Sequence, residues 1–159
     1  MHQVYLLLGS NQGDRISYLY RARTSLQSLG NLQACSSIYE TAAWGLTTQP
    51  AFLNQALLLE TDRKPLDLLQ EILLIEKMLG RERKERYGPR TIDIDILLFD
   101  DLIVQHERLT LPHPELTNRR FALTALAEIG GDAVHPVLAR NIGELLAQCP
   151  DPLAVTRIS

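Results

Sequence analysis

Two aspartates separated by a single residue, Asp93 and Asp95, have a spacing that could do chemistry. They alternate with three isoleucines in the segment 91–99, which reads TIDIDILLF. Successive side chains of a strand point to opposite faces, so the isoleucines would face a core and both carboxylates would leave the sheet together. Adjacent carboxylates repel each other unless a cation or a proton neutralises them, and Mg²⁺ prefers carboxylate and phosphate oxygens. An exposed strand with two solvated aspartates fits the Asp-x-Asp spacing equally well.

The segment before these aspartates is basic. Residues 81–90 contain five arginines or lysines and two glutamates, whereas the whole chain has a formal net charge of −3. A charge run alone usually means a solvated loop, but a basic segment on an acidic chain also suggests a local anion site. Arg90 lies three residues before Asp93, and Pro89 restricts the backbone beside it. Carboxylates for a metal next to guanidinium groups for phosphate oxygens together favour phosphoryl-type transfer.

Other segments leave two interpretations open. The turn 9–15 lacks the Gly-Lys-Ser/Thr ending of a P-loop, and we interpret it as a structural strand-to-helix turn. His113 stands between two prolines, where an imidazole could donate to a phosphate or make a structural hydrogen bond. Aromatic residues could stack on a flat ring or belong to the core. These aromatic residues are Trp44, Phe52, Tyr87 and Phe121.

The elements that must position these residues follow from periodicity and from turn residues. The expected strands are 4–8, 32–41, 52–61 and 91–99. The expected helices are 16–29, 65–79, 119–129 and 142–148, with an irregular segment at 109–118. The order strand, helix, strand, strand, helix, strand is typical of an α+β, ferredoxin-like βαββαβ core with C-terminal additions. Its antiparallel sheet would carry helices on one face and leave the other face free for a site.

Composition restricts the class of protein. A chain of 159 residues with 45% apolar and 22% charged residues fits one globular domain, expected to span 1–159. Cys35 and Cys149 lie far apart, so neither a disulfide framework nor a zinc site is suggested, and a cytoplasmic location is expected. No segment has the length of a membrane span, and the net negative charge argues against a nucleic-acid partner. No residue pattern addresses assembly, and a monomer is the expectation.

A non-catalytic module is the rival interpretation, because ferredoxin-like folds also host regulatory and RNA-binding domains. Such a module would not need both carboxylates beside a basic loop. An RNA binder would carry aromatic and basic residues along its strands, whereas the strand expected at 91–99 is acidic. Nucleotide binding that depends on Mg²⁺ would distinguish the enzyme from the module.

Several motifs together resemble one enzyme family. The longest is Gly-Pro-Arg-Thr-Ile-Asp-Ile-Asp-Ile at 88–96, followed by Leu-Pro-His-Pro at 111–114. Gly-Ser-Asn at 9–11, Tyr-Glu-Thr at 39–41 and Phe-Leu-Asn-Gln-Ala at 52–56 occur in the matching order. The chain resembles the 6-hydroxymethyl-7,8-dihydropterin pyrophosphokinase family over nearly its whole length. The resemblance implies a ferredoxin-like fold and transfer of pyrophosphate from Mg-ATP to the hydroxymethyl group of a reduced pterin, in folate biosynthesis.

The resemblance also implies roles for individual residues. Asp93 and Asp95 would bind two Mg²⁺ ions that bridge the ATP phosphates. Arg81, Arg83 and Arg90 would bind phosphate oxygens, the first two from a mobile loop. ATP would further contact a set in which Arg108 and Thr110 lie near the ribose and Ile96 lies near the adenine. The whole ATP-side set is Glu76, Ile96, Arg108, Thr110, His113 and Arg119.

On the pterin side, the resemblance implies that Asn54 hydrogen-bonds the heterocycle and that Phe52 and Phe121 sandwich it. Thr41 and Trp44 would help to line that pocket. Some positions depart from the common family pattern, which bears on loop closure and pocket shape rather than on the reaction. These positions are Ala42, Ala43, Trp44, Phe52, Leu73 and Tyr87.

Overall fold

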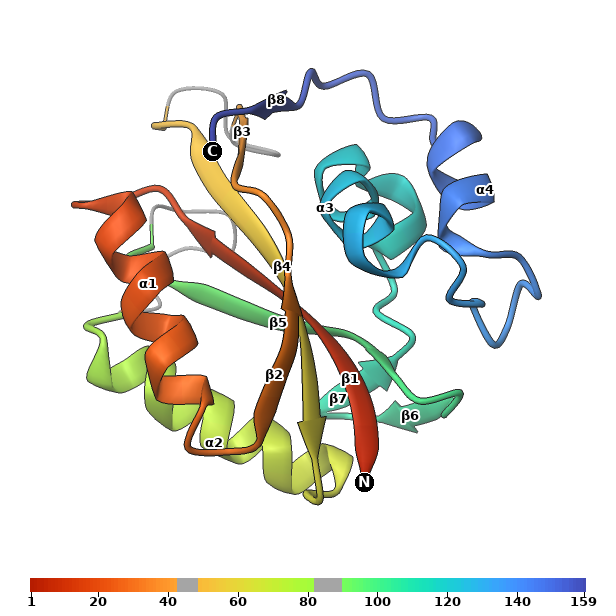
Figure 1. Cartoon of the computed structure of the whole chain (residues 1–159), viewed down its shortest axis with the longest axis horizontal. Coiled ribbons are helices and arrows are strands. Elements are labelled where there is room, and N and C mark those ends of the chain that lie inside the picture. Colours follow the sequence, from red (N-terminus) through yellow and green to blue (C-terminus); the bar gives the residue numbers. More distant parts are fainter. Residues whose placement is uncertain (43–48, 82–89) are drawn as a thin grey trace.

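The computed structural model describes residues 1–42, 49–81 and 90–159. Within those residues, six strands form one sheet in which every pair is antiparallel (Figure 1). The strands are β1 (His2–Ser10), β2 (Asn31–Cys35), β3 (Tyr39–Thr41), β4 (Phe52–Thr61), β5 (Asp93–Phe99) and β8 (Thr156–Arg157). Their order is β5-β1-β4-β3-β8. Strand β2 lies off this path and pairs with residues 57–60 of β4, whereas β3 pairs with residues 52–54. The strands β6 (Val104–His106) and β7 (Leu109–Leu111) form a separate two-stranded hairpin.

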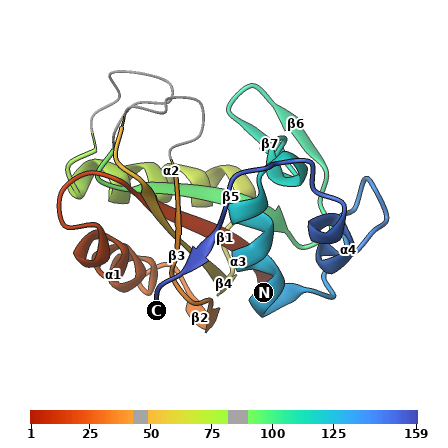
Figure 2. The same ribbon diagram turned by 90° about the horizontal axis from the view of Figure 1, so that it is seen from above.

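Two helices, α1 (Arg15–Leu26) and α2 (Pro65–Met78), cover one face of the sheet (Figures 1 and 2). Asp14 caps α1 by accepting a hydrogen bond from the Ser17 amide, and Pro65 occupies the first turn of α2, where its missing N–H costs nothing. The helices bury residues at helical spacing against alternate residues of β1, β4 and β5. The main helical members of this core are Leu19, Ala22, Leu26, Leu68, Ile72 and Ile75.

The other face of the sheet is not free of helices. The expectation of helices on one face is met by α1 and α2, but α3 (Arg120–Gly130) packs on the opposite face together with α4 (Ile142–Ala147). Helix α3 turns Leu123 and Leu126 onto Leu7 and Ala56, which point away from α1 and α2. A second apolar core therefore covers part of this face, and α3 forms one border of the surface that remains.

The strand expected at 32–41 is broken into β2 and β3. The register changes by one residue between Cys35, which pairs with Leu57, and Tyr39, which pairs with Asn54. Ser36 lies at the break, where its amide donates to the Ala56 carbonyl and its hydroxyl accepts from the Ala56 amide. The serine hydroxyl replaces a backbone acceptor at this irregularity, a local bond that periodicity does not reveal.

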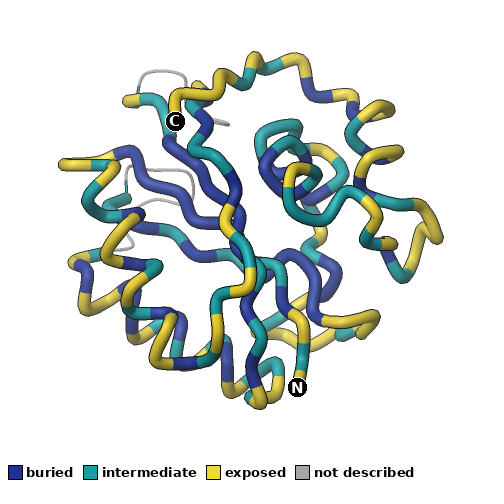
Figure 3. Tube along the Cα trace, in the orientation of Figure 1, coloured by how far each residue is buried: buried dark blue, intermediate teal, exposed yellow. Residues whose placement is uncertain are grey.

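Burial follows the two cores. In Figure 3 the central strands are mostly buried, while the outer turns of α1 are exposed. The segment expected to be irregular at 109–118 contains β7 and the 3₁₀ helix η1 (Leu116–Asn118), with a cis peptide bond between Leu111 and Pro112. No helix among the described residues combines the length and apolar composition needed to cross a membrane.

Candidate active site

Strand register brings the predicted residues together on the face that α3 partly covers. Gly9 of β1 pairs with Asp93 of β5 on one side and with Asn54 of β4 on the other. Leu7, two residues earlier, pairs with Asp95. Because residues two apart on a strand share a face, these five side-chain positions share one surface. The two carboxylates and the amide thus lie on the same face across three adjacent strands.

Gly9 leaves room for the Asn54 amide in this arrangement. A Cβ atom at this position would lie 3.1 Å from Asn54 Oδ1 and 3.5 Å from Phe52 Cδ1. The first distance is tighter than ordinary van der Waals contact, so a side chain would press on the Asn54 amide. The glycine therefore forms a low floor between the carboxylates and Asn54.

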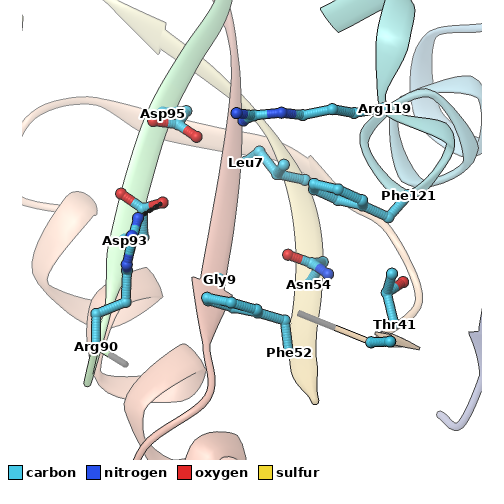
Figure 4. Close-up of a pocket in the computed structure, with 11 residues that line it drawn as sticks. Leu7, Gly9, Thr41, Phe52, Asn54, Arg90, Asp93, Asp95, Arg119 and Phe121 are labelled. Carbon is cyan, nitrogen blue, oxygen red and sulfur yellow. Dashed lines mark hydrogen bonds and ion pairs between the residues drawn. The ribbon is translucent and has the colours of Figure 1, made fainter. Parts of the chain in front are cut away.

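One pocket opens above this floor (Figure 4). Phe52 enters from the start of β4, and Phe121 enters from the first turn of α3. In Figure 4, Asn54 and Thr41 lie near the two rings, while Asp93 and Asp95 lie across the floor from them. We call this pocket the ring pocket. It is lined by Leu7, Gly9, Thr41, Ala42, Phe52, Asn54, Arg90, Asp93, Asp95, Arg119 and Phe121.

A second pocket lies on the other side of the carboxylates, between α2 and the β6–β7 hairpin. We call it the phosphate pocket, after the phosphate contacts that the sequence resemblance implies for Arg81, one of its lining residues. It is lined by Leu69, Leu73, Glu76, Arg81, Asp93, Ile94, Asp95, Ile96, Glu107, Arg108, Leu109, Thr110, His113 and Pro114. Asp93 and Asp95 line both pockets. A ligand in either pocket would therefore meet the same carboxylate pair.

Asp93 is held by two arginines. Arg81 Nη1 lies 2.9 Å from Asp93 Oδ1, and Arg90 Nη1 lies 3.1 Å from Asp93 Oδ2. Arg81 Nη1 also lies 2.8 Å from Glu76 Oε1. All four side chains are largely buried, so these charge-assisted bonds are screened less than surface ion pairs.

Glu76 has a structural contact that its position in the sequence does not indicate. It is only 3% exposed, and its Oε2 accepts a hydrogen bond of 2.7 Å from the Ile94 amide. Strand β5 lies at the edge of the sheet, so this amide has no neighbouring strand to bond. Glu76 thus anchors the backbone between Asp93 and Asp95 to helix α2.

Asp95 has an unusual protonation equilibrium. Burial first, and then the negative charge of Asp93, raise the pKa of Asp95 from 3.8 to about 8, while the positive charge of Arg119 opposes the shift. In Figure 4 the Arg119 side chain extends from the start of α3 toward Asp95. The carboxylate pair therefore holds a proton near neutral pH unless a cation neutralises it.

His113 is neutral at physiological pH. Burial, and then the charge of Arg119, lower its pKa from 6.5 to about 4. Its Nδ1 lies 3.1 Å from the Glu115 amide, so Nδ1 is the acceptor in this contact. The ring proton is therefore on Nε2, and His113 can serve the phosphate pocket as a neutral donor.

Every described residue that the sequence predicts for the site lines one of these two pockets. Arg119, expected on the ATP side, lines the ring pocket and faces the carboxylates. Arg83 and Trp44 lie outside the described residues, and so do the loop segments whose closure the sequence prediction concerns. Leu7, Gly9 and Leu69 are lining residues that the sequence prediction missed. The alternation of β1 could have indicated Leu7 and Gly9 only if the pairing partners were known.

Comparisons with known proteins show the family of this chain. The sequence model of the family described as 7,8-dihydro-6-hydroxymethylpterin-pyrophosphokinase (HPPK) matches residues 5–131. The 2-amino-4-hydroxy-6-hydroxymethyldihydropteridine pyrophosphokinase of Aquifex aeolicus is 42% identical over 144 residues, which cover 91% of this chain and 90% of the relative. The enzyme of the same name from Haemophilus influenzae is 40% identical over 153 residues, covering 95% of each.

Solved structures share the fold. The wild-type HPPK-DHPS of Plasmodium falciparum superimposes with a TM-score of 0.75 at 17% sequence identity. The match covers 92% of this chain but only 44% of that chain, so this chain spans less than half of the larger protein. At this identity the likeness concerns the fold, and it supports the mixed helix and antiparallel-sheet architecture described above.

The shared carboxylates, the arginines around them and these relatives together define an ATP-dependent pyrophosphokinase. The resemblance seen in the sequence motifs is confirmed by the family match. The chain belongs to the 7,8-dihydro-6-hydroxymethylpterin-pyrophosphokinase family.

Proposed function

We propose that this chain transfers the pyrophosphoryl group of Mg-ATP to the hydroxymethyl group of 6-hydroxymethyl-7,8-dihydropterin, giving AMP and the pterin diphosphate for folate biosynthesis. The observation that carries the proposal is that one carboxylate pair borders two pockets of different character. The ring pocket has aromatic and amide groups for a flat heterocycle. The phosphate pocket has cationic and hydroxyl groups for a nucleotide. Group transfer between two substrates requires such a shared border.

The pterin would lie in the ring pocket. Thr41 and Asn54 are each 3% exposed, and among the described residues Thr41 Oγ1 and Asn54 Nδ2 have no hydrogen-bond partner. Buried polar atoms are costly unless they are paired, and the polar edge of a pterin would pair them. Phe52 and Phe121 would stack on its two ring faces, with the undescribed Trp44 as a further expected neighbour.

ATP would lie in the phosphate pocket with its β-phosphorus near the carboxylates. Ile96 and Arg108 would contact the adenosine part, and Thr110 would lie near the ribose. His113 would donate from Nε2, and Glu76 would act mainly by holding Arg81 and β5. Arg119 would place a positive charge between the two substrates, because it lines the ring pocket and faces Asp95.

The residues present fit magnesium. Two acidic side chains on one face, one of them protonated near neutral pH because burial and the charge of the other raise its pKa, form the oxygen donor set that this cation prefers. Asp93 and Asp95 would hold the metal, and we propose two ions by resemblance to the family. When bound, Mg²⁺ supplies charge neutralisation at the phosphate oxygens.

The chain's own residues orient the reaction. The substrate hydroxyl oxygen attacks the β-phosphorus in line, and its proton passes to Asp95 or to water. The new O–P bond forms as the bond from that phosphorus to the α-phosphate bridging oxygen breaks, and AMP leaves. Arg81 and Arg90, which pair with Asp93, would transfer part of their hydrogen bonding to the phosphates when ATP arrives. Arg83 is expected to join them. A loose transition state makes little demand for a strong base, so positioning and charge supply most of the catalysis.

We also propose a ferredoxin-like core with C-terminal additions, in a single domain over 1–159 that acts as a cytoplasmic monomer. The order β1, α1, β2 with β3, β4, α2, β5 supports the core, if β2 and β3 are taken as one interrupted strand. The packing of α3 and α4 on the same sheet supports a single unit. Sedimentation of the purified chain would test the monomer.

The test of the function is incubation with ATP, Mg²⁺ and the reduced pterin, with AMP and the pterin diphosphate measured by chromatography. We expect equimolar amounts of both products. The matched control is the 6-methyl analogue of the pterin, which lacks the attacking hydroxyl and should give neither transfer nor AMP. Release of ADP in place of AMP, or AMP release independent of the hydroxymethyl group, would contradict the proposal.

A further inference from the structure

Asn11 is a buried polar residue outside both pockets. It follows β1 directly, is 1% exposed, and lies in the turn that the sequence indicates as structural. A buried primary amide can accept at its oxygen and donate twice at its nitrogen, and here both ends are used. Its partners belong to two segments that are far apart in the sequence.

The oxygen end of Asn11 holds Arg90. The Arg90 backbone amide donates to the side-chain oxygen of Asn11, Oδ1, over 2.9 Å. The backbone amide of Asn11 donates in turn to the Arg90 carbonyl over 3.2 Å. The side chain thus acts as the missing strand carbonyl and extends the pairing of β1 with β5 beyond Gly9 and Asp93. It fixes the backbone from which the Arg90 guanidinium reaches Asp93.

The nitrogen end of Asn11 holds the segment that leads into β4. Asn11 Nδ2 donates to Gln49 Oε1 over 2.8 Å and to the Pro50 carbonyl over 3.1 Å. Pro50 lies two residues before Phe52, whose ring lines the ring pocket. The Arg90 guanidinium in turn lies over the Phe52 ring, with 5.9 Å between Arg90 Cζ and the ring centroid. One amide therefore ties together the backbones that carry a phosphate-side arginine and a pterin-side ring.

We propose that Asn11 is a positioning residue that couples the two pockets by holding Arg90 and the approach to Phe52 in one fixed arrangement. The role requires an acceptor and a donor on the same short side chain, which alanine and an ionised aspartate do not provide. Because Asn11 bonds both segments, a ligand that shifts Arg90 would also shift Pro50, so that occupancy of one pocket would change the affinity of the other. This inference rests on the proposed function, because it takes the two pockets as the ATP and pterin sites.

Two variants distinguish the contact made by the side-chain oxygen of Asn11 from the contacts made by its side-chain nitrogen. Asn11→Ala removes every side-chain contact. Asn11→Asp keeps an acceptor for the Arg90 amide but cannot donate to Gln49 or Pro50. The matched control is Thr61→Val at the far end of the sheet, where a buried hydroxyl donates to the Leu29 carbonyl over 2.7 Å and accepts from the Arg63 amide. This control should lower the melting temperature without touching either pocket.

The measurement is the dissociation constant of the pterin, with and without Mg²⁺ and a nonhydrolysable ATP analogue, together with kcat and KM. We expect the analogue to tighten pterin binding by about ten-fold or more in the wild type and by less than about two-fold in Asn11→Ala, within the usual range of coupling between sites. Asn11→Asp should raise the pterin KM by about ten-fold with a smaller change in kcat, because it loses the two bonds donated to Gln49 and Pro50.

The outcomes separate this inference from the function itself. A wild type that makes no pterin diphosphate would refute the proposed function. An active wild type whose Asn11→Ala variant keeps full coupling, or loses only melting temperature as Thr61→Val does, would overturn the inference alone. If Asn11→Ala does not fold, Asn11→Asp decides, because unchanged pterin KM and coupling in that variant would equally exclude the role.

Discussion

Asp95→Asn should stabilise the ligand-free protein at neutral pH, although it removes a residue on which the proposed chemistry depends. The pKa of Asp95 is raised from 3.8 to about 8 by burial and by the charge of Asp93. The folded state therefore holds a proton that the unfolded chain has released. The contribution of Asp95 to the free energy of unfolding is fully present at low pH. It is lost as the pH rises from 3.8, the pKa in the unfolded chain, toward about 8, the pKa in the folded protein.

The size of this effect follows from the shift. Between the two pKa values the free energy of unfolding should fall by about 1.4 kcal/mol for each pH unit. At pH 7 the accumulated loss would be up to about 4 kcal/mol, a large part of the stability of a typical domain. Asparagine keeps the shape and carries no charge, so the variant should recover much of this loss.

The assay is guanidinium unfolding in EDTA at several pH values between 6.5 and 8. His113, whose pKa is lowered from 6.5 to about 4 in the folded state, adds an opposing slope near pH 6.5, but this contribution is common to the wild type and Asp95→Asn and cancels in their comparison. We expect a falling free energy of unfolding for the wild type and a flatter profile for Asp95→Asn. Asp132→Asn, at an exposed carboxylate, is the matched control and should keep the wild-type slope.

Addition of Mg²⁺ with an ATP analogue should reverse the ranking. The cation would compensate the charges of the pair, so the ligands should raise the melting temperature of the wild type much more than that of Asp95→Asn. Parallel pH profiles for the wild type and Asp95→Asn would refute the reasoning. Equal ligand-induced stabilisation of both proteins would refute the metal assignment.

Three further variants test other parts of the site. Arg90→Ala should lower kcat by about 10- to 100-fold, the value of one charge-assisted bond, and a normal rate when chemistry limits turnover would exclude a catalytic contact. Asn54→Ala should raise the pterin KM by about ten-fold or more with little change in the ATP KM, so equal changes in both would argue against a pterin contact. The low pKa of His113 implies that its own contribution to stability falls as the pH drops from about 6.5 toward 4, opposite in sign to the contribution of Asp95 over that range. His113→Gln should remove that contribution, measured by guanidinium unfolding between about pH 4 and 6.5, and identical profiles for the variant and the wild type would contradict the buried neutral imidazole.

Local sequence determined most of the elements, although not the break between β2 and β3, and it indicated the chemistry at the carboxylates. The alternation around Ile94 placed Asp93 and Asp95 on one face, because strand side chains have a period of two whatever the neighbouring strands are. Pro65 and the spacing of apolar residues marked α2 for the same reason, since a helical face is a property of one segment. The sequence motifs also carried the family resemblance.

The tertiary structure decided which segments meet. Register set Asn54 and Asp93 on either side of Gly9, and packing placed α3 on the face that was expected to be open. The edge amide that Glu76 satisfies depends on β5 having one neighbour, and no single segment encodes that. Asn11 looked like a turn residue because its partners lie 38 and 79 positions away. Periodicity reports the faces of one element, whereas pairing between distant segments depends on the packing of the whole chain.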